Sequence, residues 1–218
     1  MLPLAVIFDM DGLMLDTESL GARAWEVVAA ERGIAFDSAV AQRLIGRTVA
    51  DCRALMLDHH GEDYPVDALM AGWNAAFDAL VEREGLALKP GLTELLDWLA
   101  ERAIPRAVAT STRRSRARSR LEATGLWPRF AALVGGDDVA RGKPAPDIFL
   151  AAAQRLDVPP LRCLVLEDSP PGLLAAAAAG IPAVMVPDLI APPAEVAGRP
   201  PRVMATLHEV RDWLASLG

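Results

Sequence analysis

Four short runs of almost continuous apolar residues constrain the fold of this chain more than any other feature. They are LAVIFD (4–9), RAVATS (106–111), CLVLED (163–168) and AVMVP (183–187), with a weaker run, AALVGG, at 131–136. Consecutive rather than alternating apolar residues predict strands covered on both faces, as in a parallel sheet. Helical patterns lie between the runs, at 91–102, 115–125, 147–157 and 172–180. This alternation, which holds from about residue 90 onward, predicts an α/β fold.

The segment from about residue 17 to residue 88 breaks this alternation and looks helical throughout. It is punctuated by glycines of the kind that often end helices, namely Gly33, Gly46, Gly61 and Gly85. The chain returns to the alternating pattern at the joint Pro90-Gly91. We therefore expect a catalytic core made of residues 1–16 and 89–218, with an all-helical domain inserted at 17–88.

Composition excludes several classes of protein. Hydrophobic residues make up 52% of the 218 residues, which is ample for a core, and the net charge of -7 argues against nucleic-acid binding. No run of about 18 apolar residues lacks a breaker, so no membrane span is expected. The N-terminus has no basic region before Asp9, unlike a signal peptide, and Cys52 and Cys163 do not make a disulfide framework. We therefore expect the protein to be cytoplasmic and monomeric.

Polar residues follow three of the apolar runs directly. They are Asp9, then Thr110 with Ser111, then Glu167 with Asp168. The carboxyl ends of parallel strands meet at one edge of a sheet, and open α/β sheets bind their ligands there. The sequence therefore predicts one site at that edge.

Asp9 and Asp11 place two carboxylates on one face of an extended segment, and Gly12 allows a tight turn after them. Their repulsion is tolerated if a divalent cation neutralises them. Magnesium prefers oxygen ligands, usually one or two carboxylates with phosphate and water. Glu167 and Asp168 would supply further carboxylates to the same ion. From the residues alone, either such a cation is bound or the pair does chemistry itself.

Thr110, Ser111 and Lys143 suit an anionic ligand. A hydroxyl and free backbone N–H groups at a strand end can bind a phosphate oxygen, and a lone ammonium counters the charge of a bound anion. Each cluster alone also has a purely structural interpretation, as a turn, a helix cap or a loop. The four clusters in this order, three of them at strand ends, form a much more specific signal.

The pattern as a whole resembles the haloacid dehalogenase superfamily, in the branch with a helical cap inserted after the first strand. The matching stretches are FDMDG (8–12), ATST (109–112), GKPAPDIFLAAAQRL (142–156) and LVLEDSPPGLLAAAAAGIPAV (164–184). The resemblance extends over nearly the whole chain and points to the branch that holds sugar-phosphate phosphatases and β-phosphoglucomutase. It implies a Rossmann-like core, Mg²⁺ as cofactor, and phosphoryl transfer through an aspartyl-phosphate.

The resemblance also implies roles for individual residues. Asp9 falls on the nucleophile, Asp11 on the general acid/base, Thr110 on the phosphate-binding hydroxyl, Lys143 on the phosphate-side lysine and Asp168 on a metal ligand. Asp9 would also hold the metal, and Asp11 would do so through its backbone carbonyl. Glu167 falls on a carboxylate that is a direct or an indirect ligand in different members.

The leading hypothesis is a Mg²⁺-dependent phosphatase that acts on a small phosphorylated metabolite. A phosphomutase of the same fold is the first alternative. A catalytically silent phosphate-binding module is disfavoured because every carboxylate and the lysine are present. Dehalogenases lack the second aspartate of the first motif, and Asp11 is present. Phosphonate-cleaving relatives need a lysine in the cap, and residues 17–88 contain none, so this reaction is disfavoured. Lys89, at the joint, is the one lysine that could serve this purpose.

The helical insert is expected to act as a lid that excludes water and contacts substrate. Arg47 is the candidate substrate contact, because it follows Gly46 at a break between helices. Trp25 lies at helical spacing from apolar neighbours and is expected in the core of the insert. Arg23 is expected on a solvated face.

Two positions favour hydrolysis over the mutase reaction. β-Phosphoglucomutases place a His four residues after the Thr that matches Thr17, and an Arg three residues after the cap glycine. Gly21 and Val49 occupy the matching positions here. Because neither residue can take over the mutase side chain's role, the sequence predicts that water accepts the phosphoryl group. The exception is Arg47, which lies near enough to Val49 to substitute for the missing arginine.

Overall fold

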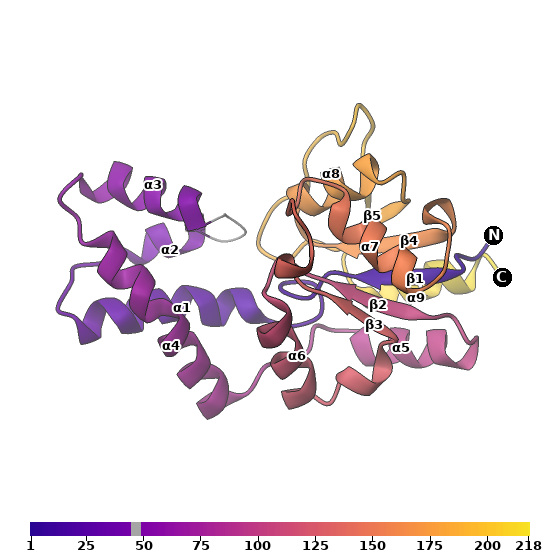
Figure 1. The fold of residues 1–218 in the computed structure, drawn as a ribbon, viewed down its shortest axis with the longest axis horizontal. Coiled ribbons are helices and arrows are strands. Elements are labelled where there is room, and N and C mark those ends of the chain that lie inside the picture. The colour runs from indigo at the N-terminus through magenta and orange to yellow at the C-terminus, as the bar shows by residue number, and fades with distance from the viewer. Residues whose placement is uncertain (45–48) are drawn as a thin grey trace. The chain divides into compact units, whose positions relative to one another are not determined.

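The structure is a computed structural model that describes residues 1–44 and 49–218. It divides the chain into two compact units, one of Met1–Leu15 with Ala87–Gly218 and the other of Asp16–Leu86. The first is an α/β unit and the second is helical (Figure 1). Within the described residues, no helix has both the length and the apolar character needed to cross a membrane.

The α/β unit is built on a parallel sheet with the strand order β3-β2-β1-β4-β5-β6. The strands are β1 Ala5–Phe8, β2 Arg106–Ala109, β3 Ala132–Val134, β4 Cys163–Glu167, β5 Ala183–Met185 and β6 Arg202–Val203. Each of the five apolar runs contains one strand, so the predicted parallel sheet is confirmed. The edge strand β6 was not predicted, because its two exposed residues form no apolar run.

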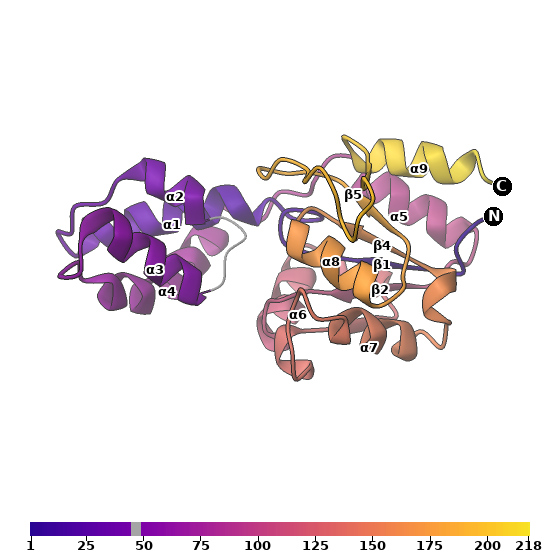
Figure 2. The same cartoon turned by 90° about the horizontal axis from the view of Figure 1, so that it is seen from above.

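Helices cover both faces of this sheet. They are α5 Leu92–Glu101, α6 Arg114–Ala123, α7 Asp147–Arg155, α8 Pro170–Ala178 and α9 Leu207–Ala215, with short 3₁₀ turns at Trp127–Arg129, Gly136–Asp138 and Pro160–Arg162. Figure 2 shows α5 and α9 on one face and α7 and α8 on the other. This two-sided cover explains why all four residues of β1 are buried. The helix α9 lies outside the predicted helical segments, although Thr206 and Glu209 form a capping pair at its start.

The core between the sheet and α7 and α8 is apolar, with Ile7, Val165 and Phe149 fully buried in it. On the opposite face, α5 packs against α9. Gly91 precedes α5 with a φ of 85°, and a Cβ at this position would overlap the backbone of His208. A glycine is therefore needed for the two helices to approach.

The helical unit contains α1 Thr17–Glu31, α2 Ser38–Leu44, α3 Val49–His60 and α4 Val66–Glu84. Its core includes Val28, Leu69 and Phe77. Trp25 is buried in this core, as predicted. The Arg23 side chain is 47% exposed, which confirms its solvated position, and pairs with Glu84. The predicted substrate contact Arg47 lies outside the described residues.

Candidate active site

The carboxyl end of β1 is the point where the chain order of the sheet reverses. β1 lies between β2 and β4, so that the residues after these three strands are neighbours. Asp9 donates its backbone N–H to Leu166 O at 3.0 Å, and Thr110 donates its own to Val134 O at 3.0 Å. Asp9, Thr110 and Glu167 are all buried. Such a reversal is where open α/β sheets bind ligands.

Lys143 lies between two of the predicted carboxylates. Its Nζ is 2.5 Å from Asp9 Oδ1 and 2.5 Å from Glu167 Oε1. The three side chains are 5%, 8% and 0% exposed respectively. One ammonium between two buried carboxylates leaves one negative charge in surplus. Because buried charge is costly, this group, which we call the ion cluster, gains from additional positive charge.

The pKa values within the ion cluster reflect that surplus. The pKa of Asp9 is raised to about 8: burial is the largest cause, Lys143 opposes it, and the charges of Glu167 and Asp11 add to it. Burial lowers the pKa of Lys143, but Asp9 and Glu167 more than offset this, so that its pKa lies above the ordinary value. Lys143 is therefore charged, and Asp9 is the carboxyl that a nearby cation would return to its ionised form.

Glu167 is engaged through both of its oxygens. Oε1 accepts from Lys143, and Oε2 accepts from the backbone N–H of Ser169 at 2.9 Å and from its hydroxyl at 2.8 Å. A Cβ on Gly172, in the first turn of α8, would overlap the Glu167 carboxylate. Glu167 was predicted as either a direct or an indirect metal ligand, and both of its oxygens already have partners within the protein.

Asp11 is held by three side chains of the same unit. Thr112 Oγ1 donates to Asp11 Oδ2 at 2.7 Å, and Thr110 Oγ1 donates to the same oxygen at 3.2 Å. Arg120 NH1 donates to Asp11 Oδ1 at 2.6 Å. The predicted residues Asp11 and Thr110 are thus brought together, whereas Thr112 and Arg120 were not predicted as site residues.

The periodicity of α6 gives only a partial signal for Arg120. Arg120 lies three residues after the buried Ala117, but Arg118 lies three residues before the buried Leu121. Spacing alone therefore does not separate the two arginines, whereas the contact with Asp11 does. Ser111, a predicted phosphate contact, is exposed. Arg114, in the first turn of α6, donates from NH1 to Asp138 Oδ2 at 3.1 Å.

Gly12 lets two further carboxylates approach the same edge. Its φ is 83°, and a Cβ there would overlap Asp168 Oδ2 and lie 3.6 Å from Asp188 Oδ2. Asp188 Oδ1 accepts from Lys89 Nζ at 2.6 Å. Asp188 Oδ2 is buried and has no hydrogen-bond partner among the described residues. Asp188 and Lys89 were not predicted as site residues. Asp188 directly follows the apolar run 183–187, so its position at the end of that run was a signal that could have found it, whereas Lys89 follows no such run.

The residues at this edge fit Mg²⁺. Among the described residues, no three His, Cys, Asp or Glu side chains converge to hold a metal by themselves. Magnesium usually needs only one or two carboxylates, since phosphate and water complete its shell. Asp9 and Asp168 are buried oxygen donors of that kind. The surplus charge of the ion cluster and the unpartnered oxygen of Asp188 are both consistent with a cation nearby.

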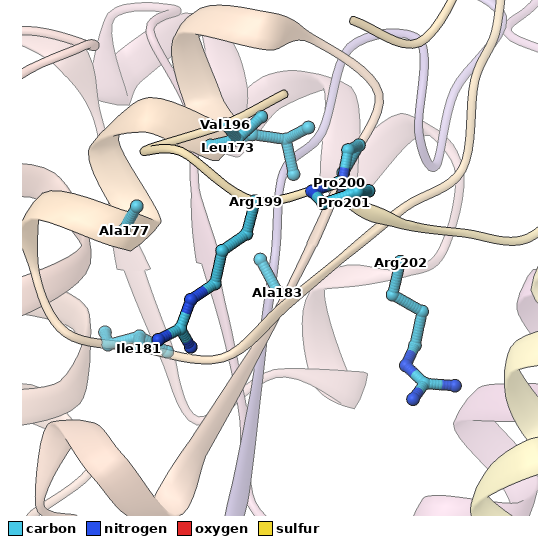
Figure 3. Close-up of a pocket in the computed structure, with 9 residues that line it drawn as sticks. All are labelled: Leu173, Ala177, Ile181, Ala183, Val196, Arg199, Pro200, Pro201 and Arg202. Carbon is cyan, nitrogen blue, oxygen red and sulfur yellow. The ribbon is translucent and has the colours of Figure 1, made fainter. Parts of the chain in front are cut away.

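A pocket elsewhere on the α/β unit has a different character. Its lining includes Leu173 and Ala177 of α8, Arg199 and Pro200 of the loop before β6, and Arg202. Figure 3 shows Arg199 extending toward Ile181, whereas Arg202 points away. No predicted site residue lines this pocket, and its lining contains no carboxylate or hydroxyl side chain that could act on a substrate.

Comparison with known proteins identifies the family. Residues 3–180 match the haloacid dehalogenase-like hydrolases. The bifunctional riboflavin kinase/FMN phosphatase of Arabidopsis thaliana is 32% identical over 187 residues, which cover 84% of this chain and 48% of that protein. The mitochondrial (DL)-glycerol-3-phosphatase 1 of Arabidopsis thaliana is 37% identical over 197 residues, covering 84% of this chain and 63% of that protein. The chain thus spans less than two thirds of both relatives.

Among solved structures, CbbY from Rhodobacter sphaeroides in complex with phosphate has the same fold. It superposes with a TM-score of 0.78 and 30% identity, and the alignment covers 96% of each chain. The family match extends over most of the chain and includes Asp9, Asp11, Thr110, Lys143, Glu167 and Asp168. The chain therefore belongs to the haloacid dehalogenase-like hydrolases.

Proposed function

We propose that the chain is a Mg²⁺-dependent phosphatase that hydrolyses small phosphomonoesters through an aspartyl-phosphate on Asp9. The observation that carries this proposal is the buried ion cluster of Asp9, Lys143 and Glu167 at the sheet edge, with Asp11 and Thr110 beside it. Two relatives are named for the hydrolysis of FMN and of glycerol 3-phosphate, which supports a phosphomonoester as substrate.

In the first step, a carboxylate oxygen of Asp9 attacks phosphorus and the bond from phosphorus to the substrate oxygen breaks. Asp11 gives its proton to that leaving oxygen. Lys143 and the Thr110 hydroxyl stabilise the negative charge of the phosphoryl oxygens. Bound Mg²⁺, held by Asp9, Asp168 and the backbone carbonyl of Asp11, would supply charge neutralisation at the phosphoryl group.

In the second step, Asp11 takes a proton from water, whose oxygen attacks phosphorus. The bond between phosphorus and Asp9 breaks, and inorganic phosphate leaves. Asp11 therefore serves as acid and then as base. Glu167 keeps Lys143 in place throughout, since its other oxygen is anchored by Ser169.

Water as the phosphoryl acceptor is supported by the packing of the helical unit, our candidate lid. Trp73 Nε1 donates to Gly21 O at 3.0 Å, and a Cβ on Gly21 would lie 3.3 Å from the Trp73 ring. A histidine at position 21, as in β-phosphoglucomutases, would already be in tight contact with that ring at its Cβ, so the ring would have to shift. The position is thus built for packing rather than for a mutase side chain.

The test is a panel of phosphomonoesters with Mg²⁺, including glycerol 3-phosphate, FMN and hexose phosphates, with phosphate release as the signal. Acid-quenched enzyme is then digested and Asp9 is examined for phosphorylation by mass spectrometry. We expect release from at least one ester and a phosphorylated Asp9. Absence of release from every ester would contradict the proposal. Glucose 6-phosphate forming from β-glucose 1-phosphate and a bisphosphate primer faster than free phosphate would favour the mutase.

A further inference from the structure

We propose that Arg120 is a positioning residue that fixes Asp11 for proton transfer to the leaving group. This inference rests on the proposed function, in which Asp11 is the general acid. Arg120 lies 109 residues after Asp11 in the sequence, and α6 places its guanidinium against that carboxylate. Asp9, Lys143 and Glu167 form the ion cluster, so Arg120 is a cation additional to it.

The contact between Arg120 and Asp11 is short and shielded. The distance from NH1 to Oδ1 is 2.6 Å, and the two side chains are 11% and 21% exposed. Hydrogen bonds between ionised groups are stronger than neutral ones, and they gain further where water is largely excluded. Arg120 is therefore a strong donor to Asp11 Oδ1, whereas the two threonine hydroxyls donate to Oδ2.

The threonine contacts explain why Arg120 matters once substrate binds. The Thr110 hydroxyl has a single proton, which it gives to Asp11 Oδ2 in this structure. In the proposed reaction the same proton serves a phosphoryl oxygen, so Oδ2 loses one of its two donors and can carry the proton for the leaving group. Arg120 on Oδ1 and Thr112 on Oδ2 then remain to fix the carboxyl. General acid catalysis depends on such placement within hydrogen-bond reach.

The same helix offers a matched control. Arg118 lies two residues before Arg120, but its side chain is 44% exposed and pairs with Glu122 at 2.6 Å. Its guanidinium carbon lies 3.6 Å from the centre of the Trp127 ring. Replacing Arg118 removes an arginine from α6 without touching Asp11, so that it reports the structural cost of losing an arginine there.

The experiment compares Arg120→Met, Arg120→Lys and Arg118→Met with the parent on two substrates. One is an alkyl phosphate taken from the panel, whose alkoxide leaving group needs a proton. The other is p-nitrophenyl phosphate, whose phenolate leaves as a stable anion. For Arg120→Met we expect kcat/KM to fall by about 10-fold to 100-fold with the alkyl ester and by less than about 3-fold with the aryl ester. Arg120→Lys should recover part of the loss, and Arg118→Met should match the parent on both esters.

An equal loss on both esters, or no loss on either, would overturn the inference, because only a role in proton transfer depends on the leaving group. Circular dichroism and thermal melting establish that each variant folds. Should Arg120→Met fail to fold, the same comparison in Arg120→Lys decides the matter, with equal effects on both esters again overturning the inference. If the parent is inactive on every ester, both the proposed function and the inference are overturned. If the parent is active but the Arg120 variants lose the same activity on both esters, the inference alone is overturned.

Discussion

The α/β unit and the helical unit each contain a short ion pair, and the two differ in their surroundings. In the α/β unit, Lys143 is 2.5 Å from Asp9, and both side chains are less than one tenth exposed. In the helical unit, Arg23 is 2.6 Å from Glu84, and these side chains are 47% and 32% exposed. The distances are nearly equal, so distance alone does not reveal which pair does chemistry.

Burial and charge balance separate the two pairs. Arg23 binds both oxygens of Glu84, and solvent screens the pair, which is the usual state of a surface ion pair. Lys143 serves Asp9 and Glu167 together, which leaves a surplus negative charge out of contact with water. Such an arrangement lowers the stability of the folded protein. Strongly perturbed groups of this kind cluster at functional sites. The predictions below test this contrast, from the largest expected effect to the smallest.

The largest effect is expected from Asp9→Asn, which keeps the volume of the side chain but removes the negative charge that makes the carboxylate oxygen a nucleophile. Phosphate release should fall by about 10⁴-fold or more, because no other group replaces a nucleophile. Steady-state assays with the best ester of the panel measure the loss, and circular dichroism controls for folding. A variant that keeps substantial turnover would remove Asp9 as the nucleophile.

Chelation of Mg²⁺ should abolish turnover reversibly, because without the cation the raised pKa of Asp9 favours the protonated carboxyl, which is a poor nucleophile. The assay is phosphate release in EDTA and again after Mg²⁺ is restored.

Asp168→Ala should weaken Mg²⁺ binding as measured by calorimetry, while its melting temperature without metal stays close to that of the parent. Full turnover after thorough chelation would contradict the cofactor, and unchanged Mg²⁺ binding in the variant would contradict the ligand.

Lys143→Met should destabilise the metal-free protein by about 3 kcal/mol, because two buried carboxylates lose their shared counter-charge. The matched change in the helical unit, Arg23→Met, should leave the free energy of unfolding nearly unchanged, because Glu84 can be hydrated instead. Urea unfolding followed by circular dichroism measures both values. Similar losses in the two variants would show that burial does not distinguish the pairs.

The smallest effect, at most about 1.4 kcal/mol for each pH unit, concerns titration. The pKa of Asp9 is raised to about 8 in the folded protein, above its unfolded value. The folded state therefore binds the proton more tightly, and this stabilisation is lost as the pH rises through about 8. Metal-free parent should thus lose stability relative to Asp9→Asn, which cannot titrate, between about pH 5 and about pH 9. Urea unfolding at several pH values tests this, and a difference independent of pH would contradict it.

Much of the α/β unit was predictable because the relevant signals are local. The run before Asp9 is apolar at consecutive positions, which is typical of a strand covered on both faces. Residues such as Thr110 and Glu167 could be placed at strand ends for the same reason. The misses, β6 and α9, lie in the Pro-rich C-terminal segment, where β6 is short and exposed and α9 follows loop-like sequence.

The sequence by itself determined the strands β1 to β5, the helical character of the segment after β1 and which carboxylates follow strands, because burial periodicity is a property of neighbouring residues. Only the tertiary structure decided that β1 is flanked by β2 and β4, and that Lys143 reaches Asp9 across 134 positions. It alone singled out Arg120 from the arginines of α6. Alternate arginines along that helix look alike in sequence, but the rotation of the helix against the sheet turns this one toward Asp11. That rotation is set by long-range packing, which no local pattern encodes.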